Sequence, residues 1–288
     1  MIAKRTAGRP LPAIRALILC ALIAGCGGRA PVSSAVDETA GVESTIPAAS
    51  TVTTPAIVDA KADDRGRLST AQALLLSRAL VKNEEVKGAI VAVTVPFGPA
   101  ATFTLAGPVD WAGDRAALVL STKRSDGVAV PNSPVFWDRG AILTEVDGLP
   151  AAMAAKGRSG VRFVARAMNP KGVSLDQLIT FVGSLAVDRA ENPILIRQAD
   201  TAFVGTKVID GITVEGYRYA KTKYWIDPST GLLREVEARF ARYNTPVLIA
   251  LSGHGPQTIT LPPTDQVVDG STIPDVLAAL KPTPTPTP

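Results

Sequence analysis

The sequence has 288 residues, with 30 Lys and Arg against 26 Asp and Glu, so its formal net charge at pH 7 is +4. The excess bases lie within residues 1–25, which contain no acid, and the rest of the chain is neutral. Nucleic-acid binding depends on clustered Lys and Arg that neutralise phosphates, so this composition excludes it as an expected function. The hydrophobic content of 46% is ample for a folded core.

Residues 1–25 have the composition of a signal peptide. A basic start is followed by the apolar run 16–25, which is only half as long as the roughly 20 residues that a membrane-spanning helix needs. The segment 22–26 resembles the bacterial lipobox, in which small residues precede a cysteine that is linked to diacylglycerol and becomes the first residue. We therefore expect Cys26 to be lipidated, with palmitate among the attached acyl chains. An uncleaved anchor and an ordinary signal peptide are the alternatives.

The two cysteines support the lipid interpretation. Cys20 would be removed with the signal peptide, and Cys26 would be acylated. No thiol would remain for a disulfide or a metal site, and the sequence predicts neither a metal site nor a cofactor. The expected location is the cell membrane, lipid-anchored, on the extracytoplasmic face.

The mature chain divides into three parts. Residues 26–63 lack aromatic residues and a sustained apolar period, which is typical of a disordered tether. Residues 64–280 have the composition of a folded domain. Residues 281–288 repeat Pro and Thr, which favours a disordered tail in the polyproline II conformation.

Three helices are expected in the domain. Ser69 and Gln72 form a capping-box pattern that predicts a helix reaching about residue 83, and Ser174 and Gln177 form a second one. The second helix carries apolar residues at helical spacing as far as Leu185. A third, short helix is expected over 193–198.

The rest of the domain has the pattern of β-strands and turns. Residues 232–241 alternate between apolar and charged side chains, as expected of a sheet with one buried face. Asp210-Gly211 separates two strand patterns and predicts a hairpin. The sequence therefore predicts an α+β domain with a curved antiparallel sheet of about ten strands and a few helices on one face. The candidate strands are 89–97, 101–106, 115–122, 134–137, 141–146, 161–166, 201–209, 212–219, 222–227, 232–241, 246–252 and 257–261.

No catalytic constellation is evident in the sequence. The domain has one histidine, His254, with Ser252 close by in what is expected to be a turn, and no nucleophile-elbow motif. Glu235 and Glu237 share a strand face, where a solvated charge ladder is the simpler interpretation. We therefore do not expect an enzyme.

Two motifs carry a family resemblance: the segment 223–233 (KYWIDPSTGLL) and the segment 259–263 (ITLPP). With the lipoprotein signal, the tether and the capped helix before the first strand, the chain resembles the actinobacterial LppX/LprG lipoproteins. These belong to the LolA-like superfamily of lipid and lipoprotein carriers. The resemblance implies an antiparallel half-barrel with helices on its concave face, which holds a lipid or a similar ligand.

The expected function is accordingly a membrane-anchored lipoprotein that binds a lipid, glycolipid or other hydrophobic ligand, and transport of that ligand is left open. The alternative is an envelope protein-interaction or sensor module with the same fold and a protein partner. Apolar positions on expected strands or on the second helix are the candidate ligand-binding residues, with ordinary core packing as their alternative role. They are Val93, Val95, Phe103, Leu118, Leu120, Phe136, Phe163, Leu178, Phe181, Val182 and Trp225.

Overall fold

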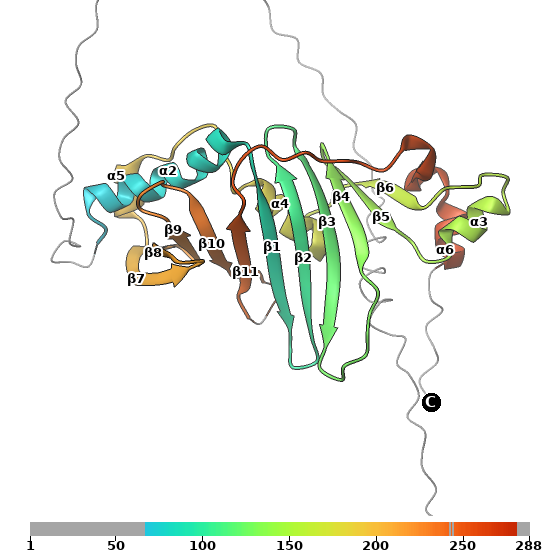
Figure 1. The fold of residues 1–288 in the computed structure, drawn as a ribbon, viewed down its shortest axis with the longest axis horizontal. Helices are drawn as coiled ribbons and strands as arrows, with labels where there is room; N and C mark the ends of the chain where they lie inside the picture. Colours follow the sequence, from blue (N-terminus) through green and yellow to red (C-terminus); the bar gives the residue numbers. More distant parts are fainter. Residues whose placement is uncertain (1–66, 242, 244, 281–288) are drawn as a thin grey trace, which may run out of the picture.

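The computed structural model describes residues 67–241, 243 and 245–280 (Figure 1). The expected signal peptide, Cys26, the tether and the Pro/Thr tail lie outside these residues. The described part is an open sheet of twelve strands with five α-helices, which confirms the α+β class.

The five helices vary in length from six residues to seventeen. They are α2 (Thr70–Val86), α3 (Leu149–Ala154), α4 (Ser174–Gly183), α5 (Pro193–Gln198) and α6 (Pro274–Leu280), and two 3₁₀ turns are η1 (Thr264–Gln266) and η2 (Gly270–Thr272). The three predicted helices correspond to α2, α4 and α5. The sequence did not indicate α3 or α6.

One of the two predicted capping boxes is present. At the start of α2, Ser69 Oγ accepts a hydrogen bond from the backbone N–H of Gln72, and Gln72 Oε1 accepts one from the N–H of Ser69. The predicted box of α4 is wrong, because Ser174 is the first helical residue and Val173 is the N-cap. Val173 is buried in the main core, so tertiary packing places the helix start one residue earlier.

All twelve strands belong to one sheet in the order β12-β6-β5-β4-β3-β2-β1-β11-β10-β9-β8-β7. Every neighbouring pair is antiparallel except β12 and β6. The strands are β1 (Gly88–Phe97), β2 (Ala101–Asp110), β3 (Arg115–Arg124), β4 (Ser133–Asp138), β5 (Ala141–Glu145), β6 (Phe163–Ala167), β7 (Thr201–Ile209), β8 (Ile212–Tyr219), β9 (Thr222–Ile226), β10 (Leu233–Ala238), β11 (Val247–Ser252) and β12 (Val267–Asp269).

The predicted strand at 257–261 is wrong. Those residues form no strand pairs, and the chain after β11 instead crosses the end of the sheet toward α6 (Figure 1). The neighbouring edges are already occupied, because β1 pairs with both β2 and β11. The last strand forms later in the chain, where β12 joins β6.

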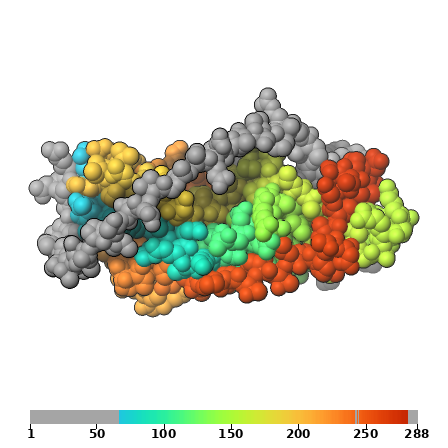
Figure 2. All heavy atoms as spheres, turned by 90° about the horizontal axis from the view of Figure 1, so that it is seen from above, coloured from blue at the N-terminus to red at the C-terminus, as the bar shows by residue number. Residues whose placement is uncertain are grey.

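One face of the sheet, which we call the inner face, is covered by helices. Cross-strand partners place Val236, Ile249, Val93, Leu105 and Leu120 in one row on this face. Side chains of α2, α4 and α5 belong to the same core cluster as these strands. Figure 1 shows α4 behind the central strands, and Figure 2 shows it recessed between the α5 end and the β6 end. The opposite side of the sheet is the outer face.

A second, smaller core lies at the β6 end of the sheet. It joins α3 and α6 to the sheet edge, which places these helices beside the short strand β12 (Figure 1). At the other end, β8 is the only neighbour of β7 among the described strands. The two ends of the sheet therefore differ: one edge is covered by helices and a three-residue strand, and the other is a nine-residue strand. The buried residues of this small core are Val146, Leu149, Met153, Val161, Val164, Val268, Ile273, Val276 and Leu277.

Candidate ligand-binding site

Most of the residues expected to line a ligand cavity lie on the inner face. Val93, Val95 and Leu118 are buried in the main core, and Phe103 and Leu120 pack against it. The expected residues of α4 are in the same place: Leu178 and Val182 belong to this core, and Phe181 packs against it. The sheet and α4 thus bring these residues together.

Three of the expected residues lie on the outer face instead. Leu118 pairs with Val135, so the next residue, Phe136, projects to the opposite side of the sheet. Its ring contacts that of Phe163, with 5.5 Å between the centroids. Trp225 also lies on the outer face, where its indole N–H donates to Glu237 at 3.0 Å.

The inner face beneath α4 is closely packed. The indole N–H of Trp111 donates to the carbonyl of Val182 at 3.1 Å, which fixes the end of α4 over the sheet. Gly183 lies so close to the sheet that a Cβ there would be 2.8 Å from Cη2 of Trp137. The contact between α4 and the sheet therefore leaves no room for even one methyl group at this point.

Aromatic side chains gather where β1 and β10 end, at one end of the inner face. Phe97 and Phe103 meet edge to face with centroids 5.5 Å apart. Phe240 contacts Phe181 at 5.3 Å and Tyr243 at 6.1 Å. Phe97 is exposed and the other four are partly buried. This part of the inner face is therefore more accessible than the part beneath α4.

A pocket of about 270 Å³ opens farther along the inner face, between α2, α5 and the tyrosines of β8 and β9. Its wall between the helices is the segment 187–191, which leads from α4 to α5. None of the expected ligand-binding residues is part of its lining. The sequence did not indicate this pocket. The lining residues are Leu76, Ser77, Ala79, Leu80, Val187, Arg189, Ala190, Glu191, Ile196, Tyr219 and Tyr224.

Two polar side chains of this pocket are joined by a hydrogen bond. The hydroxyl of Tyr219 donates to Glu191 Oε1 at 2.6 Å. This hydrogen bond and partial burial raise the pKa of Tyr219 to about 12. Burial also raises the pKa of Tyr224, and the nearby Glu191 adds to the effect. Both hydroxyls are consequently neutral at physiological pH and can donate or accept hydrogen bonds.

Two hydrogen bonds hold the start of the pocket wall, and the residues just before it, against α2. The buried Asn83 of α2 donates through Nδ2 to the carbonyl of Leu185 at 2.8 Å. The N–H of Val187 donates to the carbonyl of Leu80 at 3.2 Å. The pocket is therefore a built feature of the fold, because fixed hydrogen bonds position the residues on both of its sides.

The other candidate groups have structural partners. His254 Nε2 lies 2.9 Å from the carbonyl of Leu233, as suits a turn. Glu235 forms an ion pair with Lys207, and Glu237 forms one with Lys223 at 2.8 Å. Within residues 67–241, 243 and 245–280, no three His, Cys, Asp or Glu side chains are placed to share a metal ion. No helix in this part of the chain is long and apolar enough to cross a membrane.

Comparison with known proteins reveals similarity in structure only. No protein-family model matches the sequence, and no curated protein matches it. The fold is similar to LprF from Mycobacterium bovis, with 14% identity and a TM-score of 0.42 over 69% of this chain and 99% of that chain. An uncharacterized conserved protein from Thermus thermophilus is 8% identical, with a TM-score of 0.33 over 68% of this chain and 97% of that chain. A chain of the MucA/MucB complex from Pseudomonas aeruginosa is 14% identical, with a TM-score of 0.29 over 67% of this chain and 59% of that chain.

Proposed function

We propose that this protein is a membrane-anchored envelope lipoprotein that binds a hydrophobic or amphipathic ligand, such as a lipid or glycolipid, on the inner face of its sheet. The observation that carries the proposal is the pocket between α2, α5 and the tyrosines of β8 and β9. Its volume of about 270 Å³ is close to the lower end of the range of about 300–1,000 Å³ that is typical of ligand sites.

The lining of the pocket favours a ligand with an apolar body and a hydrogen-bonding end. Leu76, Leu80 and Ile196 supply an apolar wall. Each buried CH₂ group contributes about 0.8 kcal/mol, so the affinity for an acyl chain would rise with each methylene that the pocket takes up. Tyr219 and Glu191 supply polar groups, and a hydroxyl or amide of the ligand could replace their mutual hydrogen bond.

A pocket-filling substitution tests this assignment. Ala190 lines the pocket and is exposed at its rim, so Ala190→Trp should obstruct the pocket without entering the main core. We expect it to weaken binding of a fluorescent fatty-acid probe at least tenfold, as measured by titration of the full chain with Cys26→Ser. The matched control is Ala155→Trp, at an exposed position that ends α3 near the other end of the sheet. Equal affinity of both variants for the probe would contradict the assignment.

The proposed anchor is the diacylglycerol-modified Cys26, which would hold the domain on the extracytoplasmic face of the cell membrane. The support is the lipobox-like segment 22–26 that follows the basic and apolar residues 1–21. Metabolic labelling with a palmitate analogue tests it. We expect the label in the unchanged protein and its loss in Cys26→Ser, and label that persists in that variant would contradict acylation there.

The edge strand β7 favours a second candidate function, which is contact with an envelope protein. Phe203, Val204 and Val208 of this strand are exposed, and within the described part of the chain only β8 pairs with it. An exposed edge can pair with an extended segment of another chain. Photo-cross-linking from position 206, an exposed site on β7, would capture such a partner in cells. A binding role of either kind is proposed here in place of a catalytic one.

A further inference from the structure

Helix α5 packs one face against the core and exposes two apolar side chains to solvent. Ile196 is buried and lines the pocket, while Ile194 and Leu195 are 63% and 56% exposed. Leu74 of α2 is also exposed, and it lies one turn after Thr70, whose hydroxyl is 3.3 Å from Arg197 Nη1 of α5. We call Leu74, Ile194 and Leu195 the α5 patch. Ile194 and Leu195 are neighbours in the chain, and with Leu74 they place exposed aliphatic side chains on the two helices that line the pocket.

The described chain begins directly beside this patch. The carbonyl of Leu68, which is fully buried, accepts a hydrogen bond from Arg197 Nε of α5 at 3.0 Å. The residues that lead back to Cys26 therefore join the domain at the α5 side. In Figure 1 the start of α2 and α5 lie together at one end of the molecule. An anchor at Cys26 would consequently be attached to the same end that carries the α5 patch.

We propose that the α5 patch docks on the lipid bilayer that carries the anchor, with Ile194 and Leu195 inserted among the lipid chains. The inference rests on the proposed function for the anchor and for the ligand. Because Ile196 follows this pair and lines the pocket, docking would place the pocket beside the bilayer surface. A hydrophobic ligand would then pass between membrane and pocket with little exposure to water.

The patch is small, and the anchor explains why a small patch is sufficient. The expected tether would keep the domain within tens of Å of the bilayer, so a weak second contact would form as an intramolecular event at high effective concentration. Stable membrane association commonly uses two such signals, one of them an acyl chain. The side chains of the α5 patch are aliphatic, so the contact depends on apolar insertion and should persist at high salt.

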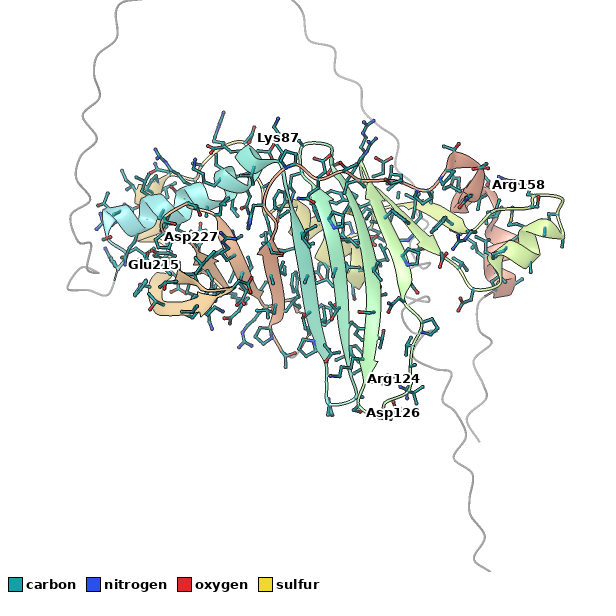
Figure 3. The ribbon with its side chains drawn as sticks, in the orientation of Figure 1. Lys87, Arg124, Asp126, Arg158, Glu215 and Asp227 are labelled. Atoms are coloured by element: carbon teal, nitrogen blue, oxygen red, sulfur yellow. The ribbon has the colours of Figure 1, made fainter. Side chains whose placement is uncertain are left out.

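Fluorescence quenching by lipids tests the docking in the complete, acylated protein. Leu195→Cys is labelled with the environment-sensitive dye NBD after reconstitution into vesicles of phosphatidylcholine and phosphatidylglycerol that contain spin-labelled acyl chains. The matched control is Val128→Cys, because Val128 is 55% exposed and follows Asp126 in the loop after β3. That loop lies at the lower end of the sheet in Figure 3, away from α5.

The expected result is at least twofold stronger quenching at position 195 than at position 128, unchanged between about 0.1 and 1 M NaCl. Equal quenching at both positions, no quenching at either, or loss of the difference in high salt would overturn the proposal. Its failure is distinct from failure of the proposed function. If position 195 is not quenched while Ala190→Trp still impairs probe binding, only the docking is wrong; if it is quenched while Ala190→Trp has no effect, only the pocket assignment is wrong.

Discussion

Asp176 is a fully buried carboxylate that ties the first turn of α4 to the sheet. Both of its oxygens accept hydrogen bonds from Arg166 of β6 at 2.6 Å, and one also accepts from the N–H of Asn169 at 2.6 Å. Removing one member of a buried ion pair leaves the other charge without compensation, which costs about 3–5 kcal/mol. We expect Asp176→Asn to lower the free energy of unfolding by about that amount, as measured by urea denaturation.

The control for this prediction is the exposed pair of Arg162 and Glu145, whose side chains are 2.6 Å apart. Exposed ion pairs contribute about 0–1 kcal/mol, because water and salt screen them. Glu145→Gln should therefore change stability by no more than this amount. If both variants lost the same stability, burial would not be the reason for the importance of Asp176.

We expect His254 to make the stability of the folded protein decrease at mildly acidic pH. Its Nδ1 is buried without a hydrogen-bond partner among the described residues, and its Nε2 contacts the carbonyl of Leu233. Burial, and to a smaller extent the nearby Arg234, lower the pKa of His254. The unfolded chain therefore binds a proton more readily than the folded protein does. Stability is fully present above about pH 6.5, the unfolded pKa, and falls as the pH drops below it.

The measurement compares the urea midpoints of unfolding at about pH 7.5 and pH 5.5, on either side of the unfolded pKa. One proton can change stability by at most about 1.4 kcal/mol per pH unit. The unchanged protein should lose more stability over this interval than His254→Asn. Asp227 does not interfere, because hydrogen bonds from Ser229 and Arg234 outweigh burial and lower its pKa to about 2. Its contribution is lost only below about pH 4. Identical pH dependence of both proteins would contradict the role of His254.

At the scale of single elements, the start of α2 can be tested through its cap. Ser69 Oγ accepts from the N–H of Gln72, a group that would otherwise lack a partner within the helix. We expect Ser69→Ala to destabilise the protein by about 1 kcal/mol and Ser69→Asp, which keeps a side-chain acceptor, to cost much less. Thermal denaturation measures both. A loss of the same size in Ser69→Asp would indicate that the hydroxyl has another role.

Elements with a strong local pattern could be predicted from the sequence. Strand β10 follows from the alternation of apolar and charged residues, and the hairpin of β7 and β8 follows from Asp210-Gly211, both of which adopt positive φ. The alternation also fixes which side chains share a face. It did not fix that Phe136 and Phe163 would project to the outer face, because that depends on which face of each strand the helices cover.

Elements that depend on distant partners could not be predicted. Strand β12 has three residues and exists because it pairs with β6. The segment 257–261 has strand-like composition but no sheet edge to join. Helices α3 and α6 are short and are stabilised by a core that they form together beside β6. In each of these cases tertiary contact, and not local pattern, determines the structure.

At the scale of the whole molecule, the inner face is divided between packing and binding. Helix α4 fills the part that the sequence indicated as the ligand site, while the pocket lies nearer β7, between α2 and the tyrosines of β8 and β9. The sequence could not indicate this pocket, because its wall at 187–191 has no periodic pattern and meets α2 only in the folded state. The pocket is also next to the point where the chain from Cys26 enters the domain.

The most direct test of the central claim is native mass spectrometry of the full chain carrying Cys26→Ser, purified from cells without detergent. The proposed function predicts a reproducible added mass from a bound hydrophobic molecule, which extraction with organic solvent removes and Ala190→Trp reduces. A protein of bare mass that also fails to bind added glycolipid or fatty acid would contradict the claim that the inner face binds a hydrophobic ligand.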